Sequence, residues 1–407
     1  MRIAVAGLWH LGTVISACLA SAGHEVTGFD ADVEGLRRGQ PPLFEPGLAE
    51  LLAQSRIEFT SDAEALREAE LVWIAYDTPV DEDDRADVDF VVGRVAALFP
   101  VLADGTLVVV SSQLPVGSVA RLESLYAQTG RRERVTFACS PENLRLGKAL
   151  ESFLSPARVV AGVRSEADRE KFARALQPIT TNVEWMSVES AEMTKHALNA
   201  FLATSVAFIN EIAVVCEAAG ADAKEVERAL KSDPRIGPRA YLSPGGAFAG
   251  GTLARDVGYL SAMRTLPLIS SVKTSNDAHQ AWPREKLLSL LGDLRDRTIA
   301  VWGLTYKPGT DTLRRSSSVE LCRWLSDSGA RVQAHDPAVK SLPPELSFIG
   351  MHATPEEAAQ NADAVVIATE WPEYRASTFR DGIIVIDANR FVSAPNVRHY
   401  AVGKGTP

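Results

Sequence analysis

The first thirty residues form a strand, a glycine-containing turn, a helix and a second strand, and this order constrains the fold more than any other feature. Residues 1–7 are a short apolar run typical of a buried strand, and an amphipathic helical pattern follows. In a Rossmann βαβ unit one glycine permits the tight turn, another permits close helix packing, and the pyrophosphate lies at the helix N-terminus. The stretch predicts dinucleotide binding by Gly7, Trp9, His10, Leu11 and Gly12.

The second strand of this unit ends at Asp30, where a carboxylate is expected to bind a ribose hydroxyl, and this favours NAD over NADP. The middle glycine of the motif, which lets the backbone approach the pyrophosphate, is replaced by Trp9. A purely structural βαβ turn is therefore the alternative. The order of the elements, together with Asp30, favours NAD binding.

Further strand-like runs alternate with helical patterns from residue 57 to residue 144, which predicts a doubly wound parallel sheet. Ligands of such sheets bind at the carboxyl ends of the strands. Thr78, Pro79 and Ser112 lie at such ends and join the candidate cofactor-binding residues, and Glu142 follows another strand. The acidic run between Asp81 and Asp89 is interpreted as a solvated loop.

Residues 298–336 repeat the pattern of the first thirty, with a strand, a turn, a helix and a strand ending at Asp336. A second NAD site is the simplest interpretation. However, the turn lacks the glycine spacing and contains Lys307, which suits a nucleotide diphosphate and is also a candidate cofactor contact. A scaffold domain without a ligand is the remaining alternative.

Residues 187–220 predict one long helix, with Ser187 as its N-cap and Gly220 just beyond its end. Its middle is apolar on nearly every side, so we expect it to be buried on most sides. Lys195 and Asn199 are four residues apart and share a helix face. Two readings are open for this pair, a structural polar contact and a functional site with a tuned lysine.

Composition excludes several classes of function. The 407 residues carry a formal net charge of −10, which argues against binding to nucleic acid or to an anionic membrane. Four scattered cysteines lack the spacing of a zinc site or a disulfide framework, so no metal is expected. We expect no apolar run to be long enough to span a bilayer, and we expect a cytoplasmic protein.

Beyond these local patterns, the chain resembles the UDP-glucose/GDP-mannose dehydrogenase family. The resemblance is carried by FDADVEGLRRGQPPLFEPGL (29–48), LPVGS (114–118), SPENLRLGKALESFLSPARVVAG (140–162), AEMTKHALNAFLATSVAFINEIA (191–213), DPRIGPRAYLSPGGAFAGG (233–251), VWGLTYKPGTDTLRRSSSVEL (301–321) and ADAVVIATEWPEY (362–374).

The resemblance implies an α/β chain of two Rossmann-like doubly wound domains joined by a long central helix. The implied domains are an NAD-binding domain (1–186), a central helical dimerisation domain (187–288) and a nucleotide-sugar-binding domain (289–407). Most members of the family oxidise a sugar C6 alcohol to a carboxylate with two NAD. A nucleotide-diphosphate sugar is thus the implied substrate, and a homodimer the implied assembly.

The resemblance also implies roles for individual residues. Glu142 matches a substrate-positioning and general acid/base glutamate, and Lys195 and Asn199 match residues that hold the oxyanion and the reacting hydroxyl. Asp256 is retained from the family's catalytic loop. Further substrate-binding residues implied by the family's segments are Leu144, Arg235, Tyr241, Leu242, Gly245, Gly251 and Arg390.

One implied residue is missing. The family's catalytic loop contains a nucleophilic cysteine, whereas residues 250–256 are one residue short at that place and contain no cysteine. Without a thiol the aldehyde cannot be carried to the acid through a thioester. We therefore expect an NAD-dependent enzyme limited to single hydride transfers. The alternatives are an epimerase with retained NAD, a standard 6-dehydrogenase and a non-catalytic binding homologue.

Overall fold

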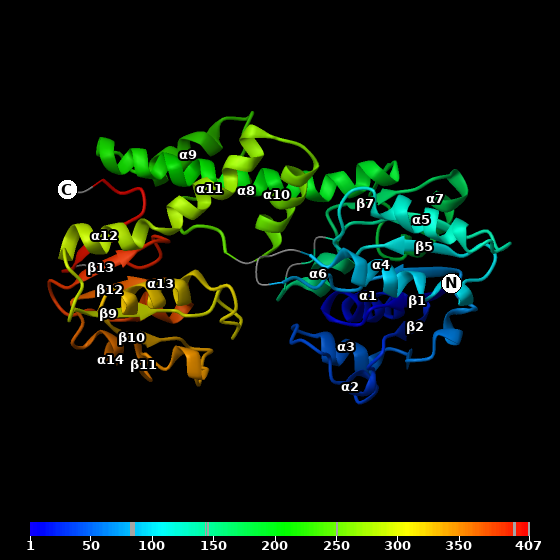
Figure 1. The fold of residues 1–407 in the computed structure, drawn as a ribbon, viewed down its shortest axis with the longest axis horizontal. Helices are drawn as coiled ribbons and strands as arrows, with labels where there is room; N and C mark the ends of the chain where they lie inside the picture. The colour runs from blue at the N-terminus through cyan, green and yellow to red at the C-terminus, as the bar shows by residue number, and fades with distance from the viewer. Residues whose placement is uncertain (82–85, 143, 145, 250, 394–395, 406–407) are drawn as a thin grey trace. The chain divides into compact units, whose positions relative to one another are not determined.

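The computed structural model describes residues 1–81, 86–142, 144, 146–249, 251–393 and 396–405 (Figure 1). The chain divides into two compact units, Met1–Leu198 and Asn199–Pro407. Each unit contains its own twisted sheet with helices on both faces, so the predicted α/β class with two Rossmann-like units is confirmed.

The sheet of the first unit has the strand order β3-β2-β1-β4-β5-β6-β7-β8. All neighbouring pairs are parallel except β6 and β7, which are antiparallel. The order reverses between β1 and β4, and such a reversal opens a ligand crevice at the carboxyl ends of the strands. The strands are β1 (Arg2–Ala6), β2 (Glu25–Phe29), β3 (Ile57–Thr60), β4 (Leu71–Ile74), β5 (Leu107–Val110), β6 (Thr136–Cys139), β7 (Val159–Gly162) and β8 (Val183–Met186).

Side chains on alternate residues of each strand enter two separate cores, because successive side chains point to opposite faces. On β1, Ile3 and Val5 pack under α1, while Ala4 and Ala6 belong to the core under α4 and α5. The helices are α1 (His10–Ser21), α2 (Glu34–Arg37), α3 (Leu48–Gln54), α4 (Val88–Ala96), α5 (Ser118–Gln128), α6 (Ala149–Leu154) and α7 (Glu166–Leu176), with short 3₁₀ turns η1 (Ala63–Leu66) and η2 (Phe99–Val101).

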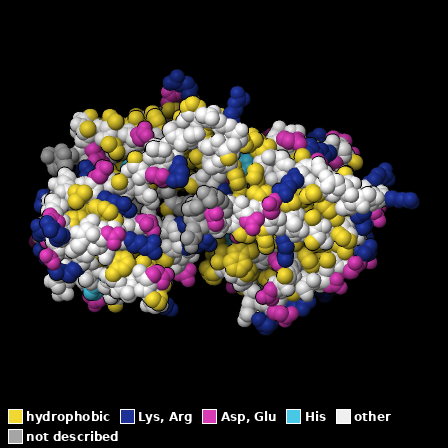
Figure 2. Space-filling view, viewed as in Figure 1, with side chains coloured by type: hydrophobic (Ala, Val, Ile, Leu, Met, Phe, Trp, Pro, Cys, Tyr) yellow, Lys and Arg dark blue, Asp and Glu magenta, His cyan; other side chains and the backbone are white. Residues whose placement is uncertain are grey.

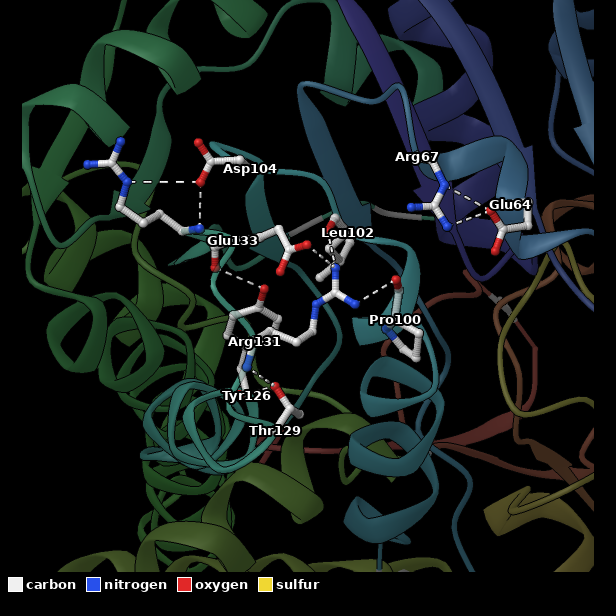
Figure 3. A network of polar contacts seen from close by, with 10 residues as sticks. Glu64, Arg67, Pro100, Leu102, Asp104, Tyr126, Thr129, Arg131 and Glu133 are labelled. Carbon is white, nitrogen blue, oxygen red and sulfur yellow. Dashed lines mark hydrogen bonds and ion pairs between the residues drawn. The ribbon is translucent and has the colours of Figure 1, made fainter.

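A network of polar contacts lies ahead of the amino ends of β5 and β6, which are the strand ends opposite the ligand crevice (Figure 3). The guanidinium of Arg131 donates to the carbonyl of Pro100 at 2.9 Å and to that of Leu102 at 3.2 Å. Tyr126 donates to the carbonyl of Glu133 at 3.1 Å. These bonds satisfy backbone carbonyl groups ahead of β5 and β6, so they contribute to stability. They lie at the amino ends of these strands, whereas ligands of such sheets bind at the carboxyl ends.

Helix α8 (Val188–Ala219) contains the boundary between the two units. Its limits agree with the prediction, since the Ser187 hydroxyl accepts a bond from the Ser190 N–H and Gly220 has a left-handed φ of 71°. The expected burial on most sides is wrong. Phe201, Phe208 and Val215 are 67%, 48% and 61% exposed.

By length and composition alone, α8 could cross a membrane, so the sequence-based expectation that no run was long enough is also wrong. Less than half of its most apolar window is buried inside the protein. Core helices of water-soluble proteins pass the same test, and one such helix is weak evidence for a membrane.

The second unit contains an all-parallel sheet with the order β11-β10-β9-β12-β13-β14. The order again reverses beside the first strand of the sheet, between β9 and β12. Its strands are β9 (Thr298–Trp302), β10 (Arg331–His335), β11 (Ile349–Met351), β12 (Ala364–Ile367), β13 (Ile384–Asp387) and β14 (Arg398–Ala401).

Two cores also flank this sheet. Ile299 and Val301 of β9 pack with α12 and α13, whereas Ala300 and Trp302 pack with α14. The helices of the unit besides α8 are α9 (Ala223–Ser232), α10 (Gly251–Met263), α11 (Pro267–Gln280), α12 (Trp282–Leu291), α13 (Ser317–Asp327) and α14 (Pro355–Ala359), with 3₁₀ turns η3 (Pro344–Leu346) and η4 (Pro372–Ala376).

Candidate active site

The turn between β1 and α1 has the geometry of a phosphate-binding turn. Gly7 has a φ of 94°, and a Cβ there would lie 2.5 Å from the Tyr76 nitrogen. A Cβ on Gly12 would lie 1.8 Å from the carbonyl oxygen of Gly7, so only glycine allows this approach of helix and turn. Trp9 precedes the helix with an ordinary negative φ of −71°, which explains why a glycine is not required there.

The side chain of Trp9, the N-cap residue of α1, forms no capping hydrogen bond with the described residues. The first N–H groups of a helix lack intrahelical partners, and together with the helix dipole they favour an anion. An uncapped N-terminus beside two glycines fits the pyrophosphate of a dinucleotide. Leu11 is half-buried in the first turn of α1, and Trp9, two residues earlier, is half-exposed.

Asp30 lies directly after β2 with its side chain 25% exposed. Its Oδ2 accepts the N–H of Leu8 at 2.7 Å, and this bond ties the end of β2 to the phosphate-binding turn. Its Oδ1 accepts the Ala31 N–H at 2.7 Å and Nη2 of Arg94 at 3.0 Å. The carboxylate is therefore held at the place where a Rossmann acid meets the adenosine ribose.

The other predicted cofactor residues of this unit also lie at strand ends. Thr78 is buried and its hydroxyl donates to the carbonyl of Gln113 at 2.8 Å, while Pro79 is exposed. The hydroxyl of Ser112 is buried, and no described residue forms a hydrogen bond with it. A buried hydroxyl without a protein partner fits a ligand that supplies one.

Glu45 connects the phosphate-binding turn to the loop that follows Glu142, and the sequence did not single it out. The carboxylate is buried and accepts Nε2 of His10 at 2.9 Å. It also accepts the N–H groups of Gly147 at 2.9 Å and Ala149 at 2.8 Å. Burial raises the pKa of Glu45, but the two N–H groups and His10 outweigh burial, and the pKa is lowered overall.

Glu142 and Lys195 lie together within the first unit. The ammonium of Lys195 donates to the backbone carbonyl of Glu142 at 2.8 Å, and both residues are half-buried. Glu142 lines a pocket whose other walls include Trp73, Phe153 and Leu198. Leu144 is half-buried in the same loop and packs against the core under α1.

Asn199 and Asp256 form the corresponding pair of the second unit. The amide nitrogen of Asn199 donates to Oδ2 of Asp256, which lies on α10 and is fully buried. On α8, Asn199 lies one helical turn after Lys195, as the sequence predicted. Gly251 is the first residue of α10, and Gly250 lies outside the described residues.

Four side chains hold the loop from Tyr241 to Ala249. Asn210 accepts the Gly245 N–H at 3.0 Å, and Nε2 of His279 donates to the carbonyl of the same residue at 2.8 Å. Asn389 accepts the N–H of Gly246 at 2.8 Å. Asn276 bonds both backbone groups of Phe248, so the loop is fixed although it contains no regular structure.

This loop forms one wall of a pocket of about 350 Å³ at the carboxyl ends of β9, β12 and β13. Tyr241 lines it from the loop, while Leu242 is buried beneath. Lys307 also lines the pocket, with its ammonium 5.5 Å from the Tyr306 ring centroid. One cation, aromatic side chains and backbone amides suit a nucleotide diphosphate.

Two predicted substrate residues are not at this pocket. Arg235 is 88% exposed, and its guanidinium donates to the neighbouring Asp233. Arg390 donates to both oxygens of Asp222, at 2.7 and 2.9 Å, and the preceding Asn389 occupies the pocket wall instead. The predicted substrate contact of Arg390 is therefore not seen at this pocket, since its guanidinium is bonded to Asp222.

All four cysteines are buried as free thiols. Burial raises the pKa of Cys18 to about 12, with the charge of Glu142 adding to the effect, and burial raises that of Cys322 to about 12. Burial likewise raises the pKa of Cys139, which lies on β6 three residues before Glu142. In the described part of the chain, no three His, Cys, Asp or Glu side chains could hold a metal ion.

Comparison with known proteins gave matches along most of the chain. Three models of the UDP-glucose/GDP-mannose dehydrogenase family match it, the NAD binding domain over residues 1–180, the central domain over 189–278 and the UDP binding domain over 300–394. A UDP-glucose 6-dehydrogenase of Pseudomonas aeruginosa is 36% identical, covering 93% of this chain and 90% of that protein. One of Rhizobium meliloti is 35% identical, covering 93% and 91%.

Solved structures are similar over the whole length. A UDP-glucose dehydrogenase from Pyrobaculum islandicum superimposes with a TM-score of 0.90 at 30% identity, covering 100% of this chain and 98% of that one. A UDP-D-ManNAc dehydrogenase from Pyrococcus horikoshii gives a TM-score of 0.87 at 25% identity, with 100% of both chains covered.

Proposed function

The chain belongs to the UDP-glucose/GDP-mannose dehydrogenase family, with an NAD-binding and a UDP-binding domain, and we propose that it catalyses a single hydride transfer from a carbinol of a nucleotide-diphosphate sugar to NAD. The product under this proposal is an aldehyde or a ketone. The relatives named as 6-dehydrogenases support oxidation at a sugar carbinol.

The observation that carries the limit to one transfer is the composition of the start of α10, where residues 251–256 read Gly-Thr-Leu-Ala-Arg-Asp. The family's second step needs a thiol that adds to the aldehyde, and the resulting thiohemiacetal loses the second hydride to give a thioester. Thr252 offers only an alcohol, which is not ionised without a strong base. Cys139 is buried with a raised pKa, so it stays a thiol and is no nucleophile.

Residues of this chain supply the groups that the first step needs. The ammonium of Lys195 and the amide of Asn199 share one face of α8 and suit the negative charge that develops on the sugar oxygen. Asp256 accepts from the Asn199 amide and orients it. Glu142 is the proposed acid/base residue for the hydroxyl proton. NAD, when bound, accepts the hydride.

The test is a stoichiometry. The protein is incubated with NAD and a panel of UDP-, GDP- and ADP-sugars, and products are identified by NMR while NADH is counted by absorbance. One NADH per aldehyde or ketone supports the proposal, whereas two per uronate would show a standard 6-dehydrogenase. A changed sugar without net NADH would instead support an epimerase with retained cofactor.

Variants separate a catalyst from a binding homologue. Lys195→Ala is expected to lower kcat by about a hundredfold or more, the usual cost of losing one oxyanion-stabilising group. Lys273→Ala, which removes an exposed lysine paired with Asp277 on α11, is the matched control and should leave kcat unchanged. Equal rates in the two variants would contradict the assigned role of Lys195.

We further propose a homodimer that uses α8. Phe201, Phe208 and Val215 are spaced by seven residues, so they lie along one exposed apolar face of the helix. Figure 2 shows hydrophobic side chains gathered where α8 and α9 reach the surface. Phe208→Asp should convert the dimer to a monomer in analytical ultracentrifugation, while Leu288→Asp on the exposed side of α12 should not. A native monomer would contradict the proposal.

We also propose the domain limits 1–186, 187–288 and 289–407. We propose a cytoplasmic location, with no binding to nucleic acid or to membranes. A net charge of −10 supports the exclusion of nucleic acid and of anionic lipid. Cell fractionation tests the location, and recovery of the protein with membranes after a high-salt wash would contradict it.

A further inference from the structure

Arg94 on α4 lies beside Asp30, the acid that we expect to bind the adenosine ribose. Its Nη2 lies 3.0 Å from Oδ1 of Asp30, and its guanidinium carbon lies 5.0 Å from the ring centroid of Tyr76. The Arg94 and Asp30 side chains are 33% and 25% exposed. The contact is partly buried, and it joins two residues that are 64 positions apart in the sequence, so it is not a local pair on one helix.

The carboxylate of Asp30 accepts hydrogen bonds from three donors, and one of these donors, Arg94, carries a positive charge. Both of its oxygens already accept hydrogen bonds, one from the Leu8 N–H and the other from the Ala31 N–H and Arg94. In Rossmann folds an acid at this place hydrogen-bonds the ribose 2′-hydroxyl of NAD, whereas an arginine nearby accommodates the 2′-phosphate of NADP. In this chain the acid and the arginine occur together.

We propose that Arg94 is a cofactor-specificity residue, and that it lets the first unit bind NADP as well as NAD. A guanidinium has five N–H donors in a planar fork, so it can keep one bond to Asp30 while it meets a second anion. The guanidinium lies over the Tyr76 ring, and this cation–π contact stabilises its position. Asp30 remains available to the ribose of NAD through its exposed edge.

The experiment measures binding of NADH and NADPH to the full-length protein by titration calorimetry, so it needs no sugar substrate. The native protein is expected to bind NADPH within about a tenfold factor of NADH, because one charge-assisted bond offsets much of the repulsion. Arg94→Ala should raise the NADPH-to-NADH ratio of dissociation constants by about tenfold or more, while the NADH constant changes by less.

Three further variants keep the outcome interpretable. Arg94→Lys, which keeps the charge, should retain part of the NADPH binding, and Arg94→Glu should abolish it. Arg67→Ala removes an exposed arginine paired with Glu64 at 2.7 Å (Figure 3) and should leave the ratio unchanged. Far-ultraviolet circular dichroism confirms that each variant is folded.

Two results would overturn the inference. The first is a native protein that binds NADH more than about a hundredfold tighter than NADPH. Asp30 would then select NAD as a Rossmann acid does, and Arg94 would not accommodate the 2′-phosphate. The second is an Arg94→Ala variant that weakens both cofactors equally, since a residue that merely positions Asp30 would not change the ratio. The inference rests on the NAD-binding domain alone, so the sugar chemistry can fail without affecting it.

Discussion

The turn after β1 and the turn after β9 begin alike and end differently. Gly7 and Gly303 both have left-handed φ values, 94° and 90°, and both donate their N–H to the last residue of the neighbouring strand. In each unit the N–H of the next residue, Leu8 or Leu304, donates at 2.7 Å to the aspartate that follows that strand.

The difference lies in what fills the anion site. Helix α1 starts three residues after its glycine with no side-chain cap, whereas α13 starts fourteen residues after Gly303 and its first N–H groups are bonded by the Ser316 hydroxyl. Asp30 stays partly exposed, but Asp336 is 4% exposed and also accepts the Thr305 N–H and the Trp371 indole N–H. The same pattern therefore suits a dinucleotide in the first unit but not in the second, and the helix cap and the burial of the acid account for the difference.

The largest expected effect is at the first turn. Gly12→Val should weaken NADH binding by more than about a hundredfold, because any Cβ there displaces the phosphate-binding turn. UDP binding by the second unit should persist, and calorimetry with each ligand checks both statements. Gly93→Ala is the matched control, since a Cβ on that helical glycine meets no atom within 4 Å. Retained NADH binding in Gly12→Val would contradict the assignment of the site.

Replacing Asp30 or Asp336 by asparagine, one at a time, sharpens the comparison. Asp336→Asn should lower the free energy of unfolding by about 2–4 kcal/mol, because two backbone N–H groups and an indole lose a charged acceptor. It should leave NADH binding unchanged. Asp30→Asn should do the reverse, with about tenfold weaker NADH binding and little change in stability. Denaturant titration and calorimetry on both variants measure this, and a similar profile for the two would break the comparison.

The third prediction concerns what the second turn binds in place of NAD. Lys307→Ala should weaken UDP binding by about tenfold, the usual value of a charge-assisted phosphate contact, and should not affect NADH. Lys340→Ala, at an exposed residue outside the pocket, is the matched control. If Lys307→Ala weakened NADH binding instead, the second turn would have to be regarded as a cofactor contact.

The smallest expected effect is a dependence on pH. Burial lowers the pKa of His279 below 6.5, more than the Gly245 carbonyl, Glu217 and Glu285 raise it. The folded state favours the neutral ring, so its contribution to the loop is present above pH 6.5 and is lost as the pH falls below that value. UDP binding should therefore weaken between pH 7.5 and 5.5, and His279→Gln should flatten the part of the profile that UDP's own titration does not explain. A profile identical in the two proteins would contradict this role.

The sequence predicted those parts of the fold that depend on neighbours in the chain. Glycine, apolar runs and an acid at a strand end gave both βαβ units, and Ser187 and Gly220 gave the limits of α8. The exposed face of α8 was missed, because an apolar composition does not say which sides find a partner within one chain.

The site was predicted less completely, since its partners are far apart in the sequence. Glu45 receives N–H groups about a hundred residues away, and Asp336 is covered by Trp371 35 residues later. Asn389 lines the pocket of the second unit, whereas the predicted Arg390 does not. Arg390 has a left-handed φ of 54°, and its guanidinium donates to Asp222. No local pattern encodes such contacts. The roles of Glu142, Lys195, Asn199 and Asp256 remain predictions.

The last residues of the chain return to the far end of α8. The Ala223 N–H donates to the Gly403 carbonyl at 2.8 Å, Glu217 accepts the Gly403 N–H at 2.8 Å, and Gly405 lies against Gly220. Replacing or removing Gly403 would therefore deprive Glu217 at the end of α8 and Ala223 at the start of α9 of a backbone partner that lies more than 170 residues later in the chain.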